Sequence, residues 1–361
     1  MNTVCKKLKI LIPVFGFGKP GGYRVLSELA NNWILCGHQV EFVTYYASDS
    51  PYYPIKAKII WINKKGNSEP SNILYKNKGN FKNNTCSILK YIKKHANEYD
   101  IILANYCFTA IPVYLASRFN YYYIQAYEPE FFTNRNFKGL LFKFIAWFTY
   151  FLPLTRIVNA EIYKNYKNIR SKYVIPPGLN LDIYYPKELR YKNKDEITVG
   201  CIGRKEEWKG SEDVASAVKM LHEKGYNIKF KVAFNPVKYK NHELVHPDGD
   251  ENLANFYRSL DILVAPGHIQ LGAIHYPVIE AMACNVPVIT TGYYPANDEN
   301  SFIVPVKRPD KIAETIKMIM NDYSIAIKKA KKARKDIQQF DWKIVSTKFI
   351  EVFEQTMNSK K

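Results

Sequence analysis

The sequence predicts an α/β protein with two doubly wound domains, each a parallel sheet covered by helices on both faces. The chain has 361 residues, which is enough for two domains of ordinary size. Short apolar segments of strand length alternate with segments of helical spacing, as parallel β-α-β units require. This alternation stops near residue 177, in a segment that contains proline and glycine, and then starts again. Two domains of this kind therefore account for nearly the whole chain.

The first domain is expected over residues 1–176. It begins with a strand at 8–14, a glycine-rich turn, a helix over 25–34 and a strand at 40–45. These elements have the order and the length of a β-α-β unit. Three more apolar runs predict further strands at 59–62, 101–104 and 121–124.

The second domain is expected over residues 177–340. A strand at 197–203 leads into a loop and then a helix over 214–221. Later apolar runs predict strands at 228–233, 262–265 and 287–290, with a helix at 277–283 between the last two. Residues 341–361 are expected to form a C-terminal helix that packs back toward the first domain.

The chain is strongly basic. It has 52 Lys and Arg against 33 Asp and Glu, so its formal charge is 52 − 33 = +19. This charge favours an anionic partner, which could be nucleic acid, an anionic membrane surface or a phosphorylated small molecule. The apolar fraction of 47% and the charged fraction of 24% are those of a globular protein. They exclude a wholly disordered chain, a collagen and a coiled coil.

A basic protein that binds nucleic acid is the alternative from another functional class. Such a protein would need basic residues interleaved with stacking aromatic residues, or a recognised binding module. Neither occurs in order along this chain, whose tyrosines and phenylalanines are spread over both halves. We therefore do not expect nucleic acid as a partner.

The cysteines and the N-terminus indicate the compartment. The six cysteines form no Cys-x-x-Cys pair, which favours buried thiols of a reducing compartment over disulfides or a zinc site. The apolar run 10–17 is broken by Pro13 and Gly16, and no small-residue cleavage site follows it. We expect no secretory signal and a cytoplasmic location, with peripheral contact to the inner face of the cell membrane left open.

Two segments bear on such a membrane contact. Residues 139–154 are almost wholly apolar, but they are fewer than the roughly 20 residues of a membrane span and include Lys143. They predict a helix that is either buried in the core or located at a membrane surface. The basic run from Lys328 to Lys335 either binds anionic lipid headgroups or is a solvated helix face.

Four glycines lie between the first strand and the first helix: Gly16, Gly18, Gly21 and Gly22. Glycines let backbone N–H groups approach an anionic ligand, and the helix N-terminus behind them favours negative charge. Pro20 interrupts the dinucleotide-binding pattern, and no acidic residue closes the second strand. NAD binding is therefore disfavoured, whereas a phosphate loop and a plain tight turn both stay open.

Two cations follow the first strand of the second domain, in the segment Gly203-Arg204-x-x-x-x-Lys209-Gly210. Open α/β sheets bind ligands at the carboxyl ends of their strands. Arginine offers a planar fork for phosphate oxygens and lysine a mobile point charge, a combination that suits a pyrophosphate. The alternative is a pair of solvated residues on a loop.

Glu280 lies in an otherwise apolar helical segment. An unpaired carboxylate in such surroundings would be costly, so we expect a hydroxyl or a cation as its partner. A solvated carboxylate at the start of a helix is the alternative.

The order of motifs along the chain resembles family 4 of the retaining GT-B glycosyltransferases. The motifs that carry this resemblance are Gly21-Gly22-Tyr23-Arg24, the link at 174–180, the Gly203 to Gly210 segment, residues 253–262, residues 280–288 and Phe340-Asp341-Trp342. The segments 127–131 and 275–277 are most similar to bacterial rhamnosyltransferases of surface-glycan assembly.

The resemblance implies two Rossmann-like domains that face each other across a cleft. It also implies a retaining, metal-independent transfer of a sugar from a nucleotide-sugar donor to a glycan or lipid-linked saccharide, for bacterial surface polysaccharide synthesis. The donor is a substrate, so no cofactor is implied. Retention would come from front-face attack, with a diphosphate oxygen helping to deprotonate the acceptor.

The resemblance also assigns roles to residues. Arg204 and Lys209 would bind the diphosphate and stabilise it as it leaves, and Glu280 would bind the ribose. The segment of Ile274, His275 and Tyr276 would contact the diphosphate or the sugar through its backbone amides. The implied donor-binding residues are Gly21, Gly22, Gly203, Arg204, Lys209, Ile274, His275, Tyr276 and Glu280.

One position departs from the family pattern. The family has two glutamates separated by seven residues, and Gly272 occupies the place of the first. A similar loss accompanies the rhamnosyltransferase-like members, whose 6-deoxy sugar has one hydroxyl fewer. We therefore expect rhamnose or another 6-deoxyhexose as the donor sugar. A GT-B protein that binds the donor without turnover is the alternative.

Two acidic motifs remain. Glu128, just after a strand of the first domain, is the candidate to orient or deprotonate the acceptor, and a solvated loop carboxylate is its alternative. Asp248-Gly249-Asp250 imitates the D-x-D metal motif of another glycosyltransferase fold. It is expected in a polar loop and does not end an apolar strand, so we expect no metal site.

Overall fold

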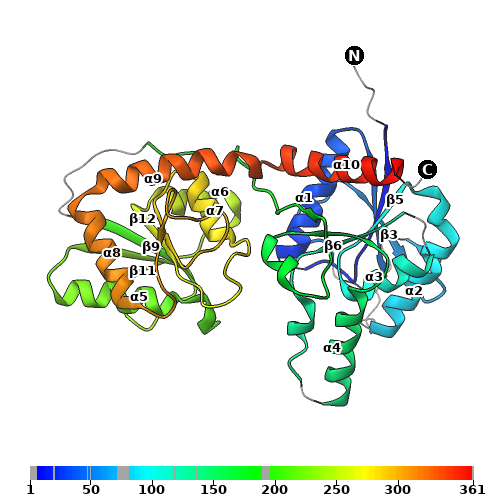
Figure 1. The fold of residues 1–361 in the computed structure, drawn as a ribbon, viewed down its shortest axis with the longest axis horizontal. Helices are drawn as coiled ribbons and strands as arrows, with labels where there is room; N and C mark the ends of the chain where they lie inside the picture. The colour runs from blue at the N-terminus through cyan, green and yellow to red at the C-terminus, as the bar shows by residue number, and fades with distance from the viewer. Residues whose placement is uncertain are drawn as a thin grey trace. The chain divides into compact units, whose positions relative to one another are not determined.

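The structure is a computed structural model that describes residues 6–18, 21–46, 48, 50–70, 81–116, 119–134, 136–188 and 196–359. The chain divides into two compact units. The first comprises residues 1–177 and 342–361, and the second comprises 178–341. Each boundary lies one residue after the position expected from the sequence. Figure 1 shows the fold of both units.

Among its described residues, the first unit has an eight-stranded sheet in the order β4-β3-β2-β1-β5-β6-β7-β8. Among the strands that the structure describes in this unit, only the edge strand β4 is antiparallel to its neighbour. The strands are β1 Lys9–Pro13, β2 Gln39–Tyr45, β3 Lys58–Ile62, β4 Ser68–Glu69, β5 Ile101–Ala104, β6 Asn120–Ile124, β7 Thr155–Val158 and β8 Tyr173–Val174. The helices are α1 Gly21–Leu35, α2 Phe81–His95, α3 Cys107–Ala116, α4 Phe137–Thr149 and α10 Trp342–Asn358, with 3-10 turns η1 Ala96–Glu98, η2 Glu128–Phe131 and η3 Glu161–Asn165.

The second unit has a six-stranded sheet in the order β11-β10-β9-β12-β13-β14, parallel throughout its described residues. Its strands are β9 Ile197–Gly203, β10 Ile228–Phe234, β11 Glu243–Val245, β12 Ile262–Ala265, β13 Val288–Thr290 and β14 Phe302–Ile303. Its helices are α5 Ser211–Glu223, α6 Gly249–Arg258, α7 Tyr276–Ala283, α8 Pro309–Asn321 and α9 Tyr323–Asp336, with 3-10 turns η4 Glu207–Lys209 and η5 Ile337–Phe340. The predicted α/β class with two doubly wound parallel sheets is confirmed.

The last helix, α10, completes the first unit. The indole Nε1 of Trp33 in α1 donates a hydrogen bond to the carbonyl oxygen of Ser346 at 3.0 Å. The same indole ring lies 5.8 Å from the ring of Phe349, between centroids. The chain therefore returns from the second unit to the core of the first.

Two local expectations are corrected by the structure. Helix α1 begins at Gly21, so Gly21 and Gly22 form its first turn and are not part of a loop. The apolar segment 139–154 lies largely in α4, whose Phe144 is 58% exposed. The alternative that this segment is plain core is therefore wrong. Among the described residues, no helix is both long and apolar enough to cross a bilayer.

Candidate functional site

The loops after β9, β12 and β13 lie at one edge of the second sheet, because these neighbouring strands run parallel. A side chain at Gly203, the last residue of β9, would collide with the backbone of Asn235. One at Gly210 would collide with the carbonyl of Pro266, and Gly210 also has a left-handed φ of 73°. These glycines let the loop after β9 pack closely on its neighbours.

Arg204 and Lys209 project from this loop and are near enough for their charges to interact. Arg204 is exposed and Lys209 is half-buried. Burial first, and the charge of Arg204 second, lower the pKa of Lys209. The Arg204 guanidinium also lies over the ring of Phe234, 6.0 Å from its centroid. Two neighbouring cations, one partly desolvated, are suited to bind a multiply charged anion such as a diphosphate.

The imidazole of His275 lies near the same two cations. Burial of the ring, followed by the charges of Lys209 and Arg204, lowers the pKa of His275 to about 3. The ring is therefore neutral at pH 7. It lies against Tyr293 with ring centroids 4.5 Å apart. Its Nδ1 atom is buried and has no hydrogen-bond partner in the described part of the chain.

Ile274 and Tyr276 flank His275 at the start of α7. Ile274 forms an isolated β-bridge with Tyr294, in the loop after β13. The Tyr276 hydroxyl donates a hydrogen bond to the carbonyl oxygen of Gly178 at 3.3 Å. These contacts hold the predicted segment 274–276 at the sheet edge, where its histidine meets the cations of the loop after β9.

Glu280 points into the core of the second unit. It is 2% exposed, and its carboxylate accepts a hydrogen bond from the Tyr257 hydroxyl at 2.8 Å. Glu280 thus has the hydroxyl partner that the sequence predicts, and the solvated alternative is wrong. A ligand hydroxyl at this position would share the carboxylate with Tyr257.

Gly272 has a backbone conformation that favours glycine. Its φ is 87°, and its N–H donates a hydrogen bond to the carbonyl oxygen of Gly292 at 3.0 Å. A glutamate here would be strained in the left-handed region. The backbone conformation at position 272 therefore favours glycine over the glutamate that the resemblance would place there.

Gly21 and Gly22 lie in the first unit, at the N-terminal end of α1. A side chain at Gly21 would meet no atom within 4 Å, whereas one at Gly22 would lie 3.4 Å from the Gln125 side chain. Lys19 and Pro20 of the predicted loop lie outside the described residues. Phosphate contact by these glycines stays a prediction.

Glu128, in η2 of the first unit, is 3% exposed. Its Oε2 accepts hydrogen bonds from the Cys107 N–H at 2.7 Å and from the Tyr122 hydroxyl at 2.9 Å. The Cys107 N–H belongs to the first turn of α3, so the carboxylate stabilises the N-terminus of that helix. Burial is the main cause that raises the pKa of Glu128 to about 7. The alternative of a solvated loop carboxylate is wrong.

Sequence reasoning missed three aromatic residues at the candidate site. Phe234 ends β10 with a left-handed φ of 74°, which is costly for a bulky side chain, and contacts Arg204. Trp208 is exposed beside Lys209, and Tyr293 supports His275. Only Tyr293 had a signal, because it follows a strand in the turn-forming segment Thr-Gly-Tyr-Tyr-Pro.

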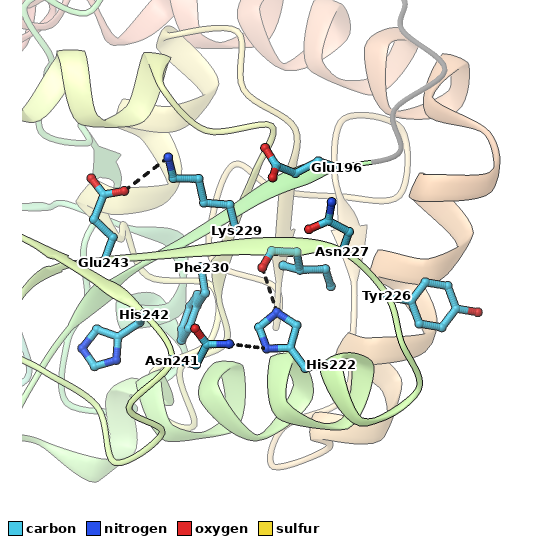
Figure 2. Close-up of a pocket in the computed structure, with 10 residues that line it drawn as sticks. Glu196, His222, Tyr226, Asn227, Lys229, Phe230, Asn241, His242 and Glu243 are labelled. Carbon is cyan, nitrogen blue, oxygen red and sulfur yellow. Dashed lines mark hydrogen bonds and ion pairs between the residues drawn. The ribbon is translucent and has the colours of Figure 1, made fainter.

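A hollow of about 420 Å³ lies in the second unit, near His222. Figure 2 shows that Glu196, Asn227 and Lys229, which line it, come from the amino-terminal ends of β9 and β10. His222 binds the carbonyl oxygen of Ile228 at 2.7 Å through Nε2, so its ring is already held by the fold. This hollow is at the edge of the sheet opposite to Arg204.

The acidic motif Asp248-Gly249-Asp250 lies at the start of α6, not in a loop. Asp250 accepts a hydrogen bond from the Tyr184 hydroxyl at 3.4 Å. In the part of the chain that the structure describes, no three or more His, Cys, Asp or Glu side chains group in a way that could hold a metal ion.

The segment that carries these residues is similar in sequence to known proteins. Residues 196–322, which contain Arg204, Lys209, His275 and Glu280, match the family described as glycosyl transferases group 1. A segment of 149 residues is 30% identical to the capsular polysaccharide biosynthesis glycosyltransferase CapM of Staphylococcus aureus. This match covers 36% of the present chain and only 38% of CapM.

Solved structures extend the likeness to the whole fold. Sucrose-phosphate synthase from Thermosynechococcus elongatus has a TM-score of 0.74 at 17% identity, over 98% of this chain and 100% of that one. HepE of Anabaena, solved in complex with UDP and glucose, has a TM-score of 0.70 at 16% identity, over 96% of this chain and 99% of HepE. The chain has the GT-B glycosyltransferase fold, and its second unit carries the sequence pattern of the group 1 glycosyl transferases.

Proposed function

We propose that this chain is a glycosyltransferase that takes its sugar from a nucleoside-diphosphate donor bound by the second unit. The observation that carries the proposal is the cluster of Arg204, Lys209 and a neutral His275 at the carboxyl edge of the second sheet. This cluster offers two neighbouring cations to a diphosphate, and the neutral histidine beside them adds no competing charge. The group 1 match over 196–322 and the UDP complex of HepE support the same reading.

The chemistry proposed is a retaining, metal-independent transfer. Cleavage of the anomeric C–O bond develops positive charge on the sugar and negative charge on the departing diphosphate. Arg204 and Lys209 would stabilise that negative charge in place, which lowers the barrier without a protein nucleophile. The acceptor would attack from the face that the diphosphate leaves, and a diphosphate oxygen would receive the acceptor proton.

The remaining assignments concern donor and acceptor. Gly272 removes a carboxylate from the sugar side of the site, which supports a 6-deoxyhexose such as rhamnose. The likeness to CapM supports a glycan or lipid-linked saccharide acceptor in bacterial surface polysaccharide synthesis. Such an acceptor would bring the protein to the cytoplasmic face of the cell membrane. Glu128 would orient the acceptor from the first unit.

Calorimetry with UDP, GDP and dTDP tests the donor site. Each charge-assisted contact contributes roughly 1.5–3 kcal/mol, so Arg204→Ala and Lys209→Ala should each weaken diphosphate binding by about 10- to 100-fold. Lys205→Ala is the matched control, because Lys205 is an exposed cation of the same loop, and it should bind as the unmodified protein does. If all three variants lose the same diphosphate affinity, binding depends on the overall positive charge of the loop and not on a specific site. Binding of random oligonucleotides but of no diphosphate would favour the nucleic-acid alternative.

Gly272 gives one reason to keep the alternative of a donor-binding protein without turnover. The two functions differ in whether a bound nucleotide sugar is ever consumed. Release of nucleoside diphosphate in a single-turnover assay with acceptor present supports the enzyme. Tight binding of diphosphate, with no release from any matching sugar nucleotide, supports the protein without turnover.

A further inference from the structure

Helix α4 exposes a continuous row of large apolar side chains. The residues that share this exposure are Phe137, Leu140, Leu141, Phe144, Trp147, Phe148 and, just after the helix, Phe151. Phe137 is the extreme case at 83% exposed. The spacing of three and four residues places them on one face of the helix, which we call the α4 apolar face.

The opposite side of α4 is the one that packs on the protein. Its buried residues are the small Gly139, Ala146 and Thr149. Ala146 belongs to a cluster with Cys107 and Phe108 of α3, and a side chain at Gly139 would collide with the carbonyl of Asn134. The half-buried Phe142 and Ile145 pack on the same cluster. The side of α4 that faces solvent nevertheless carries large apolar side chains, which is unusual for a surface helix.

The exposed aromatic rings contact one another. The ring of Trp147 lies 4.6 Å from that of Phe151 and 5.9 Å from that of Phe144, between centroids. Phe144 also stacks on Phe148 at 6.3 Å. In Figure 1, α4 extends away from the sheet of its unit, and its N-terminal end lies farthest from it. Contiguous exposed apolar side chains on a projecting helix are typical of an interaction site.

The charge around the patch indicates what it contacts. No aspartate or glutamate occurs from residue 131 to residue 160, whereas Lys138 and Lys143 are exposed on α4 itself. A second copy seated on this face would bring like charges together with no acidic residue of the segment to pair them. Anionic lipid headgroups supply the opposite charge, and the acyl boundary below them takes the aromatic rings.

The length of α4 sets the mode of contact. Its 13 residues extend about 20 Å at roughly 1.5 Å per residue, which is shorter than a hydrocarbon core of roughly 30 Å. We propose that the α4 apolar face inserts into the interface of an anionic bilayer, with Lys138 and Lys143 at the headgroups. The proposal goes beyond glycosyl transfer and needs neither donor nor acceptor to be tested.

The basic run of α9 is the rival membrane contact, and the structure weakens it. Arg334 donates a hydrogen bond to the carbonyl oxygen of Ala283 at 2.9 Å, and Lys332 pairs with Asp336 at 2.5 Å. Lys329 donates to the carbonyl oxygen of Asp298. Half of this run therefore makes contacts within the second unit, and Lys328, Lys331 and Lys335 remain as its exposed cations.

Co-flotation of the full chain with vesicles tests the proposal. Vesicles of phosphatidylcholine mixed with phosphatidylglycerol should bind the protein, and vesicles of phosphatidylcholine alone should bind it much less. The triple change Phe144→Ser, Trp147→Ser and Phe148→Ser should reduce partition at least about 100-fold, since each inserted aromatic ring contributes roughly tenfold. Lys138→Gln with Lys143→Gln should reduce it by about 10- to 30-fold, at roughly 1 kcal/mol for each lysine.

The matched control replaces Met318, Ile325 and Ile344, which are about as exposed on other helices, by serine. Vesicle binding of this control should equal that of the unmodified protein, and circular dichroism should show all variants folded. No binding to anionic vesicles would overturn the proposal. So would binding that survives the α4 triple change and is lost in Lys328→Gln, Lys331→Gln and Lys335→Gln. A dimer that needs the α4 apolar face, without vesicle binding, would assign that face to a second copy. Diphosphate binding is measured separately, so either proposal can fail alone.

Discussion

At the scale of single residues, the two carboxylates singled out by the sequence are both buried and both accept tyrosine hydroxyls. Glu280 pairs with Tyr257 in the second unit, and Glu128 pairs with Tyr122 in the first. Burying a carboxylate costs free energy unless its oxygens accept hydrogen bonds. Each glutamate therefore holds its own surroundings in place, whatever substrate contact it also makes.

Glu128→Gln should change how stability depends on pH. The pKa of Glu128 is raised from 4.5 to about 7, so the folded state holds a proton that the unfolded chain has lost between these values. Stability contributed by this group is therefore full below about pH 4.5 and is lost as pH rises to about 7. Glutamine mimics the protonated form and does not titrate. As the pH rises from 5 to 8, the free energy of unfolding of the unmodified protein should therefore fall by on the order of 3 kcal/mol relative to that of the variant.

Urea unfolding at both pH values measures this difference. Glu130→Gln is the control, because Glu130 is exposed on the same 3-10 turn, and it should leave the pH dependence unchanged. Equal pH dependence in Glu128→Gln and the unmodified protein would contradict the burial argument. If a folded Glu128→Gln variant keeps full transfer activity, Glu128 does not orient or deprotonate the acceptor.

At the scale of elements, α7 follows directly after His275 of the candidate donor site and is held at both ends. Its start is tied by the Tyr276 hydroxyl to the Gly178 carbonyl. Its end is capped by Arg334 of α9, which donates to the carbonyls of Ala283 and Tyr184 at 2.9 and 3.3 Å. A cation at the C-terminus of a helix satisfies carbonyls that have no partner within the helix.

Arg334→Ala should therefore destabilise the protein by about 1–3 kcal/mol, because it leaves these carbonyls without their charged donor. Lys335→Ala, a change at the exposed neighbour, should stay within about 0.5 kcal/mol. Chemical denaturation of both variants gives the comparison. If the two changes lower the free energy of unfolding equally, Arg334 contributes only through the overall charge of α9 and not through its hydrogen bonds.

At the scale of the whole molecule, the first unit is assembled from both ends of the chain. Helix α10 packs on α1 through Trp33, Phe349 and Phe353, and the Tyr121 hydroxyl lies 2.5 Å from the hydroxyl of Thr356. The core of this unit is therefore incomplete until the last residues are present.

Phe349→Ala should cost about 3–5 kcal/mol, because Phe349 is fully buried and the ring leaves a cavity behind. Ile344→Ala on the exposed side of the same helix should cost far less. Thermal unfolding of the two variants tests whether the distant helix belongs to this core. A mild effect of Phe349→Ala would mean that α10 contributes little to the first unit.

The local sequence pattern was enough to determine the α/β class, the two-part organisation and most strands. The reason is that apolar strand runs and helical spacing can each be recognised within a few consecutive residues. The pattern was also enough to place Arg204 and Lys209 at the carboxyl edge of the second sheet, where open α/β sheets bind ligands. The 274–276 segment was assigned to the site only through the family resemblance. Tertiary structure alone decided what surrounds each side chain. The left-handed Gly272, the neutral His275 near two cations, the buried Glu128 and the outward face of α4 depend on partners far along the chain. Burial and electrostatic environment arise only when those distant segments meet, so no local pattern could have shown them.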